Sequence, residues 1–212
     1  MKIFVIGASG RTGKLFTQLA VAGGHQVTAL VRDKRQADVP GVSYTEGLPT
    51  DEQLLGRLLL GVDAVVVALG ISRSSENPFA RVVSPLTLIS DTVKALLPAM
   101  KKNGISRLIT ISASGVGDSW DDMPLPAKLL IRYSNIMKAY EDHDRQEKLI
   151  RLSATDWTIV RPVMLNNKED EAYSATNGAP LGGNISRKAV ARFVLDTLES
   201  GSYKESCVTL SR

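Results

Sequence analysis

A glycine-rich turn directly after a short apolar run is the feature that most constrains how this chain can fold. Residues 3–6 (Ile-Phe-Val-Ile) are apolar throughout, as a parallel strand covered on both faces requires. Gly7, Gly10 and Gly13 follow at a spacing of three, and residues 14–22 can continue as a helix. Glycine permits both a sharp turn and a close approach of the backbone to a ligand. The pattern predicts a strand–turn–helix unit whose helix N-terminus holds phosphate groups; a tight structural turn without a ligand is the alternative.

Strand-like and helix-like segments alternate along the whole chain, which is typical of a parallel sheet covered by helices on both faces. Further strands are expected at residues 26–31, 42–45, 63–69, 107–112, 157–160 and 207–210. Helices are expected at residues 51–60, 84–102, 131–152 and 187–198, the last capped by Ser186. Pro85 suits the first turn of the 84–102 helix, whereas Pro98 should kink that helix or end it early.

We therefore predict one α/β domain over residues 1–212, with a Rossmann-type, doubly wound parallel sheet in a three-layer αβα arrangement. Neither repeats nor a shift in composition divide the chain. Irregular loops are expected at residues 72–81, 118–126 and 166–184, and they would shape the substrate side of the domain.

The composition narrows the possible partners. The net charge of +4 arises from 26 basic and 22 acidic residues spread along the chain, without the clustered basic footprint of a nucleic-acid-binding protein. No apolar run approaches the roughly 18 residues of a membrane span, and the apolar start is too short for a signal peptide. A single cysteine, Cys207, suits a reducing compartment. We expect a cytoplasmic protein that binds a small molecule, with no nucleic acid, membrane or metal partner.

The residues after the second predicted strand determine whether such a domain prefers NAD or NADP. At that point an acidic side chain bonds the ribose hydroxyls of NAD, and an arginine accepts the extra phosphate of NADP. Residues 30–35 read Leu-Val-Arg-Asp-Lys-Arg, so Arg32 and Arg35 favour NADP, whereas Asp33 has the position of an NAD-binding acid. A solvated charged turn is the alternative. We predict NADP, with NADPH preferred over NADH, and expect Arg11 of the glycine turn to reach a phosphate as well.

The glycine turn and the 30–33 segment resemble the atypical short-chain dehydrogenase/reductase families with an NAD(P)H-binding, NmrA-like domain. Segments 63–70, 107–114 and 157–162 are similar to the fourth, fifth and sixth strands of those families. Within the group the chain most resembles the flavin reductase/biliverdin reductase B type, through Ser112 after the fifth strand and the pair Asp142-His143. The resemblance implies a set of cofactor-binding residues in the turn and after the fourth and sixth strands: Gly7, Ser9, Gly10, Arg11, Thr12, Gly13, Leu69, Gly70 and Pro162.

The chain departs from typical short-chain dehydrogenases in the pair that carries their chemistry. Those enzymes use Tyr-x-x-x-Lys, in which the lysine lowers the pKa of the tyrosine so that it can donate a proton. Here Lys138 follows Tyr133 by five residues, and on one helix the two side chains would point about 140° apart. We therefore expect Tyr133 to pack against neighbouring residues, and the usual dehydrogenation of an alcohol is not supported.

Two other residues are the candidates for chemistry. Ser112 lies at the carboxyl end of a central strand, where open α/β sheets bind ligands. Its hydroxyl could hold the nicotinamide amide or the carbonyl of an acceptor; the alternative is a serine bonded only to backbone. His143, with an ordinary pKa near 6.5, could donate a proton near neutrality. Because acidic residues surround it, a solvated helix face is the alternative for His143.

Together these features predict an NADPH-dependent oxidoreductase that reduces a flavin, a quinone or a similar conjugated small molecule by hydride transfer. Hydride transfer is the chemistry of the cofactor, so the protein needs to supply position and electrostatics. One alternative is a non-catalytic NmrA-like sensor that passes the redox state of its dinucleotide to a partner. Another is a nucleotide-sugar epimerase or dehydratase, although such enzymes are usually longer and use the tyrosine that this chain lacks.

Overall fold

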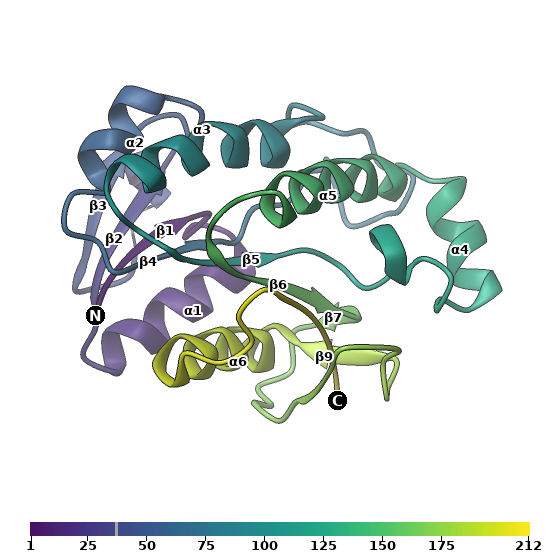
Figure 1. Cartoon of the computed structure of the whole chain (residues 1–212). Helices are drawn as coiled ribbons and strands as arrows, with labels where there is room; N and C mark the ends of the chain where they lie inside the picture. The colour runs from purple at the N-terminus through teal and green to yellow at the C-terminus, as the bar shows by residue number, and fades with distance from the viewer. Residues whose placement is uncertain (37) are drawn as a thin grey trace.

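An eight-stranded sheet runs through the centre of the molecule (Figure 1). The computed structural model describes residues 1–36 and 38–212. The strand order is β3-β2-β1-β4-β5-β6-β10-β8, and neighbouring strands are parallel except for the antiparallel pair β10 and β8. The strands of this sheet are β1 (Lys2–Ile6), β2 (Gln26–Val31), β3 (Val42–Glu46), β4 (Ala64–Val67), β5 (Arg107–Ile111), β6 (Asp156–Pro162), β8 (Ser174–Thr176) and β10 (Ser206–Ser211). The predicted Rossmann-type, doubly wound fold is confirmed, and its strand order reverses between β1 and β4.

Helices cover both faces of the sheet and make three layers (Figure 1). One face carries α1 (Arg11–Ala22) and α6 (Arg187–Ser200), and the other carries α2 (Glu52–Leu58), α3 (Leu88–Lys102) and α5 (Ile136–Arg151). The sequence of β1 is continuously apolar because both of its faces are buried. Ile3 and Val5 pack in the cluster with α1 and α6, and Phe4 and Ile6 pack in the cluster with α2 and α3. Within the described residues, no helix has the length and apolar character needed to cross a membrane.

Smaller elements lie around this frame. The short helix α4 (Leu125–Arg132) stands at one end of the molecule, beyond α5 (Figure 1). Two single turns of 3-10 helix, η1 (Lys34–Gln36) and η2 (Gly117–Ser119), follow β2 and β5. Strands β7 (Met164–Asn166) and β9 (Asn184–Ser186) form a separate parallel pair. The segment 166–184, predicted to be irregular, therefore contains β8 and begins and ends in short strands.

Backbone packing accounts for two glycines of the turn. Gly7 has φ +94°, and a Cβ atom there would lie 2.5 Å from the carbonyl oxygen of Ala68, after β4. A Cβ atom on Gly13 would lie 2.1 Å from the carbonyl oxygen of Gly7. The first turn of α1 therefore rests directly on the end of β1, which in turn rests on the end of β4. The predicted strand–turn–helix unit is confirmed.

The predicted start of the 84–102 helix is wrong. Helix α3 begins at Leu88, because the residues before it belong to a hairpin in which Val82 forms a β-bridge with Arg73. Ser84 belongs to the same hairpin, since its Oγ accepts a hydrogen bond from the Ser72 amide at 2.9 Å. Pro98 does not end the helix early, because α3 continues through it to Lys102.

The predicted single helix at 131–152 is also wrong, because the chain breaks it into α4 and α5 at residues 133–135. The cause lies in Asn135, whose amide donates to the carbonyl oxygen of Pro78 at 3.0 Å. Its side-chain Nδ2 donates to the carbonyl oxygens of Phe79 and Ala80 at 3.1 and 3.2 Å. Tyr133 therefore ends α4, and it is 73% exposed, so the expectation that it packs against neighbours is wrong.

The glycine packing predicts the effect of an added methyl group. We expect Gly13→Ala to lower the free energy of unfolding by about 1–3 kcal/mol, because its Cβ would overlap a backbone carbonyl that cannot yield. Gly56→Ala is the matched control: Gly56 lies within α2 and has open space around its Cβ position. That control should be neutral or stabilising by up to about 1 kcal/mol. Urea unfolding measures both, and equal effects would contradict the packing argument.

Candidate functional site

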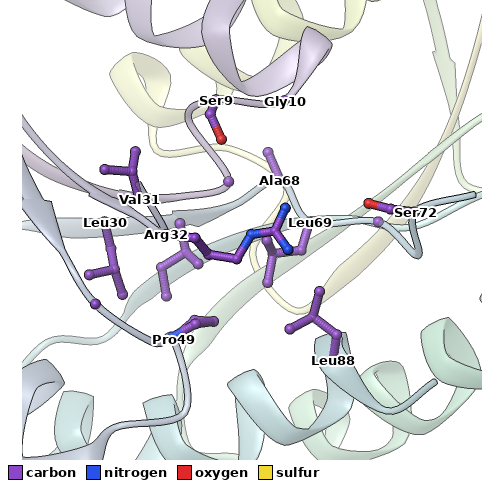
Figure 2. Close-up of a pocket in the computed structure, with 14 residues that line it drawn as sticks. Ser9, Gly10, Leu30, Val31, Arg32, Pro49, Ala68, Leu69, Ser72 and Leu88 are labelled. Atoms are coloured by element: carbon purple, nitrogen blue, oxygen red, sulfur yellow. The ribbon is translucent and has the colours of Figure 1, made fainter. Parts of the chain in front are cut away.

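A pocket opens where the strand order reverses, at the carboxyl ends of β1, β2, β3 and β4 (Figure 2). This is the position at which open α/β sheets bind ligands. The glycine turn forms one wall and the segment after β4 forms another. The lining residues are Ile6, Gly7, Ser9, Gly10, Leu30, Val31, Arg32, Gly47, Pro49, Ala68, Leu69, Gly70, Ser72 and Leu88.

The N-terminus of α1 faces this region with backbone amides that no protein group accepts. Its N-cap, Gly10, has no side chain to accept a hydrogen bond, and the first turn holds no acidic residue. Within the described residues, the amides of residues 11–13 have no hydrogen-bond acceptor. By contrast, Asp51 caps α2 and Ser186 caps α6 through their side chains. A helix N-terminus left open in this way, with its positive dipole end, fits the pyrophosphate of a dinucleotide.

Arg32 supplies the positive charge inside the pocket. Its side chain extends from the end of β2 across the pocket towards Ala68 and Leu69 (Figure 2). In the part of the chain that the structure describes, no carboxylate lies within ion-pair distance of Arg32. A guanidinium without a carboxylate partner, beside a dinucleotide pocket, fits an added phosphate group.

The other two predicted arginines bond elsewhere. Arg35 lies outside the pocket lining, and its Nε donates to Asp33 Oδ2 at 2.8 Å. Arg11 forms an ion pair with Glu76 of the 72–81 loop. The hydrogen bond from Arg35 holds the pKa of Asp33 below its ordinary value. It also occupies the carboxylate that would otherwise favour NAD.

The pocket lining contains six of the predicted cofactor residues: Gly7, Ser9, Gly10, Arg32, Leu69 and Gly70. Thr12 and Gly13 lie behind it in the first turn of α1, and Pro162 lies at the end of β6. Sequence reasoning did not name the other eight lining residues as cofactor residues, and three of them, Gly47, Pro49 and Leu88, come from segments to which it assigned no part in a site. Gly47 and Pro49 follow β3, so their position after the carboxyl end of a parallel strand could have indicated a place in the pocket. Leu88 lines the pocket because α3 begins at this residue, which the sequence did not predict.

Ser112 is bonded to a buried ion pair. Its Oγ donates to Glu147 Oε1 at 2.6 Å, so the alternative of a serine bonded only to backbone is wrong. Glu147 also accepts from Arg161 Nε at 3.1 Å, and the two charged side chains are only 3% and 5% exposed. Burial by itself would lower the pKa of Arg161, but the bonds to Glu147 and Asp118 outweigh it and hold that pKa above its ordinary value. The Ser112 hydrogen is therefore committed to a carboxylate, and its oxygen remains an acceptor.

His143 is buried, so the alternative of a solvated helix face is wrong. Burial lowers its pKa to about 4, and the neighbouring Asp142 offsets this only in part. Gln146 Nε2 donates to His143 Nδ1 at 2.9 Å and to the Ile111 carbonyl oxygen at 3.4 Å. The ring is therefore neutral at pH 7 and carries its hydrogen on Nε2. The imidazolium donor expected near neutrality does not form, and His143 offers an N–H group instead.

Asp142, the neighbour of His143, has a structural role. Its Oδ2 accepts from the amide of Ile89 at 2.8 Å, and its Oδ1 accepts from the amide of Ser90 at 3.3 Å. These amides belong to the first turn of α3, so a side chain of α5 caps the neighbouring helix. Of the pair Asp142-His143, Asp142 therefore stabilises the packing of α3 against α5.

The match to known proteins agrees with this geometry. Residues 7–201 match the model of the NAD(P)H-binding family, and the chain belongs to that family. Among curated proteins, an uncharacterised chloroplast protein of Arabidopsis thaliana is 27% identical, over 96% of this chain and 74% of the relative. The predicted membership of an NAD(P)H-binding family is confirmed.

Two solved structures share the fold. A short-chain dehydrogenase/reductase of Veillonella parvula in complex with NADP has a TM-score of 0.80 and 18% identity, covering 100% of this chain and 94% of its own. An anaerobilin reductase of Escherichia coli has a TM-score of 0.81 and 19% identity, covering 99% of this chain and 96% of its own. The chain therefore has the Rossmann fold of these reductases.

The buried imidazole predicts a pH dependence of stability. In the unfolded chain His143 has its ordinary pKa of about 6.5, so between pH 6.5 and 4 the unfolded chain binds a proton that the folded chain excludes. The free energy of unfolding should therefore decrease as the pH falls through this window, by at most ~1.4 kcal/mol per pH unit from this residue.

Two variants isolate this effect in urea unfolding between pH 4 and 6.5. His143→Gln and His143→Phe both remove the titrating group, so both should show a shallower dependence of stability on pH than the wild type. Using both variants separates the loss of titration from any change in packing. A wild-type slope in both would contradict the assignment.

Proposed function

We propose that the protein is an NADPH-dependent reductase of a flavin, a quinone or a similar conjugated small molecule. The observation that carries this proposal is the pocket itself: an open helix N-terminus and Arg32 face one cavity at the strand-order reversal. When bound, the dinucleotide supplies the hydride. The free thiol of Cys207 suits the reducing cytoplasm, where we place the protein.

The residues of the chain divide the work of binding. The amides of residues 11–13 hold the pyrophosphate, and Ser9 and the backbone of Gly10 line its path. Arg32 holds the additional phosphate, which favours NADPH over NADH. Leu69 and Gly70, after β4, form the floor of the pocket beneath the sugar.

Two buried side chains complete the proposed reaction site. Ser112 offers its oxygen as an acceptor, because its hydrogen is bonded to Glu147, and it is suited to hold the amide of the nicotinamide. His143 offers its Nε2–H group as a hydrogen-bond donor to the oxygen or nitrogen that gains charge on the acceptor. A flavin or a quinone can then take its proton from water, so no acidic side chain is required.

Replacing Arg32 tests the cofactor preference. We expect Arg32→Ala to weaken NADPH binding by about tenfold or more, because a charge-assisted bond to the phosphate is lost, with little change for NADH. Arg35→Ala is the neighbouring comparison and should cause a smaller loss, since that guanidinium is bonded to Asp33. Calorimetric titration with both dinucleotides measures these affinities, and equal losses for NADPH and NADH would refute the role of Arg32.

An activity screen tests the reaction. We expect the protein to oxidise NADPH in the presence of FMN, riboflavin or quinones, and not with simple aldehydes. Ser112→Ala and His143→Gln should slow this oxidation while leaving NADPH bound. Tight binding of NADPH without turnover of any acceptor would favour a redox sensor, in which the replacement of these two residues has no effect on function.

A further inference from the structure

A second hollow lies beside the cofactor pocket, between the hairpin that precedes α3 and the start of α5. Its lining includes Phe79, Arg81, Val82, Ser84, Leu86 and Lys138. One hydrogen bond joins the linings of the two cavities: Ser72 lines the cofactor pocket, and its amide donates at 2.9 Å to the Oγ of Ser84, which lines the hollow. The hollow is therefore a direct neighbour of the cofactor pocket.

Hydrogen bonds to backbone carbonyls hold this hollow in shape. Asn135 joins the hairpin to the junction of α4 and α5 through the three hydrogen bonds to residues 78–80. Across the hairpin, the amide of Ser74 donates to the carbonyl oxygen of Arg81 at 2.9 Å, next to the bridge between Arg73 and Val82. The backbone position of Arg81 is thus set by the hairpin register.

The hollow carries positive charge without matching negative charge. Among residues 1–36 and 38–212, no carboxylate lies within ion-pair distance of Arg81, which lines the hollow. In the described part of the chain, the one ion pair of Lys138 is with Glu141, at 3.7 Å and with both side chains about half exposed, which is a weak pair. Glu76, the acid of the same hairpin, is bonded to Arg11 instead.

Apolar side chains lie next to these cations. Phe79 is 63% exposed and Leu86 is 47% exposed, although both line the hollow. A small inorganic anion would gain nothing from these surfaces, whereas a conjugated organic molecule would cover them. The combination therefore suits a molecule with a flat apolar body and an anionic group.

We propose that this hollow binds the anionic group, a phosphate or a carboxylate, of the conjugated acceptor that the protein reduces. Arg81 and Lys138 pair with the anion, the hydroxyl of Ser84 is placed to donate to it, and Phe79 and Leu86 cover the adjoining apolar part. The inference rests on the proposed reductase function and narrows its substrate to acceptors that carry a negative charge.

Matched ligands that differ only in charge test this inference. FMN and riboflavin share one ring system and differ in the phosphate, and a quinone carboxylic acid and its methyl ester differ in the carboxylate. Their dissociation constants are measured with saturating NADP⁺, so that no turnover occurs. The variants are R81Q, K138Q and the double variant. R132Q is the control, because Arg132 is a cation of α4 outside the hollow.

We expect the wild type and R132Q to bind the anionic member of at least one pair about tenfold more tightly than its neutral counterpart. Added salt should reduce this preference, since the cations are partly exposed. The double variant should bind both members equally. The pair that shows the preference identifies the anion as phosphate or carboxylate.

The inference fails if neutral members bind as tightly as anionic ones in both pairs, if neither anionic member binds, or if the double variant keeps the preference. These outcomes are separable from the fate of the reductase proposal. Equal reduction of the charged and neutral members of both pairs would support the reductase and overturn the charged hollow. Charge-selective binding without oxidation of NADPH would support the charged hollow and contradict the reductase proposal.

Discussion

The close contact between the glycine turn and the end of β4 is the constraint on which the cofactor pocket depends. Gly13 rests on the carbonyl of Gly7, and Gly7 rests on the carbonyl of Ala68, so backbone meets backbone without an intervening side chain. This contact directs the N-terminus of α1 towards the reversal of strand order, where the chain leaves the neighbouring strands β1 and β4 towards opposite faces of the sheet. The anion-binding amides are therefore placed by packing, before any ligand-specific side chain is considered.

A second group of interactions stiffens the neighbouring carboxyl ends of β5 and β6. Glu147 receives hydrogen bonds from Ser112 and Arg161, and Gln146 connects Thr110 to His143. Buried charges and amides are costly unless every partner is present, so such a network admits few alternative arrangements. It leaves an acceptor oxygen on Ser112 and a neutral N–H donor on His143, and in the reaction site that we propose these groups suit holding a ring system better than delivering a proton.

The features predicted correctly from the sequence were those that depend on neighbouring residues. The apolar run of β1 and the three glycines report local backbone requirements, and the predicted strands of the main sheet up to β6 lie within a few residues of those observed. The helix predicted at 131–152 failed because Asn135 is bonded to Phe79, a residue 56 positions away. The predicted start of α3 was wrong for a similar reason, since Ser84 is hydrogen-bonded to Ser72 in the hairpin and is not part of the helix.

The sequence by itself determined the fold class and the dinucleotide-binding turn, because apolar periodicity and glycine spacing act over a few residues. Only the tertiary structure decided which arginine enters the pocket, since the end of β2 carries Arg32 to the place where the glycine turn and the segment after β4 meet. The state of His143 was likewise decided by its surroundings, because desolvation depends on what packs over the ring. The burial of His143 and the second hollow both depend on contacts between segments that are far apart in the sequence, and a local sequence pattern does not predict such contacts.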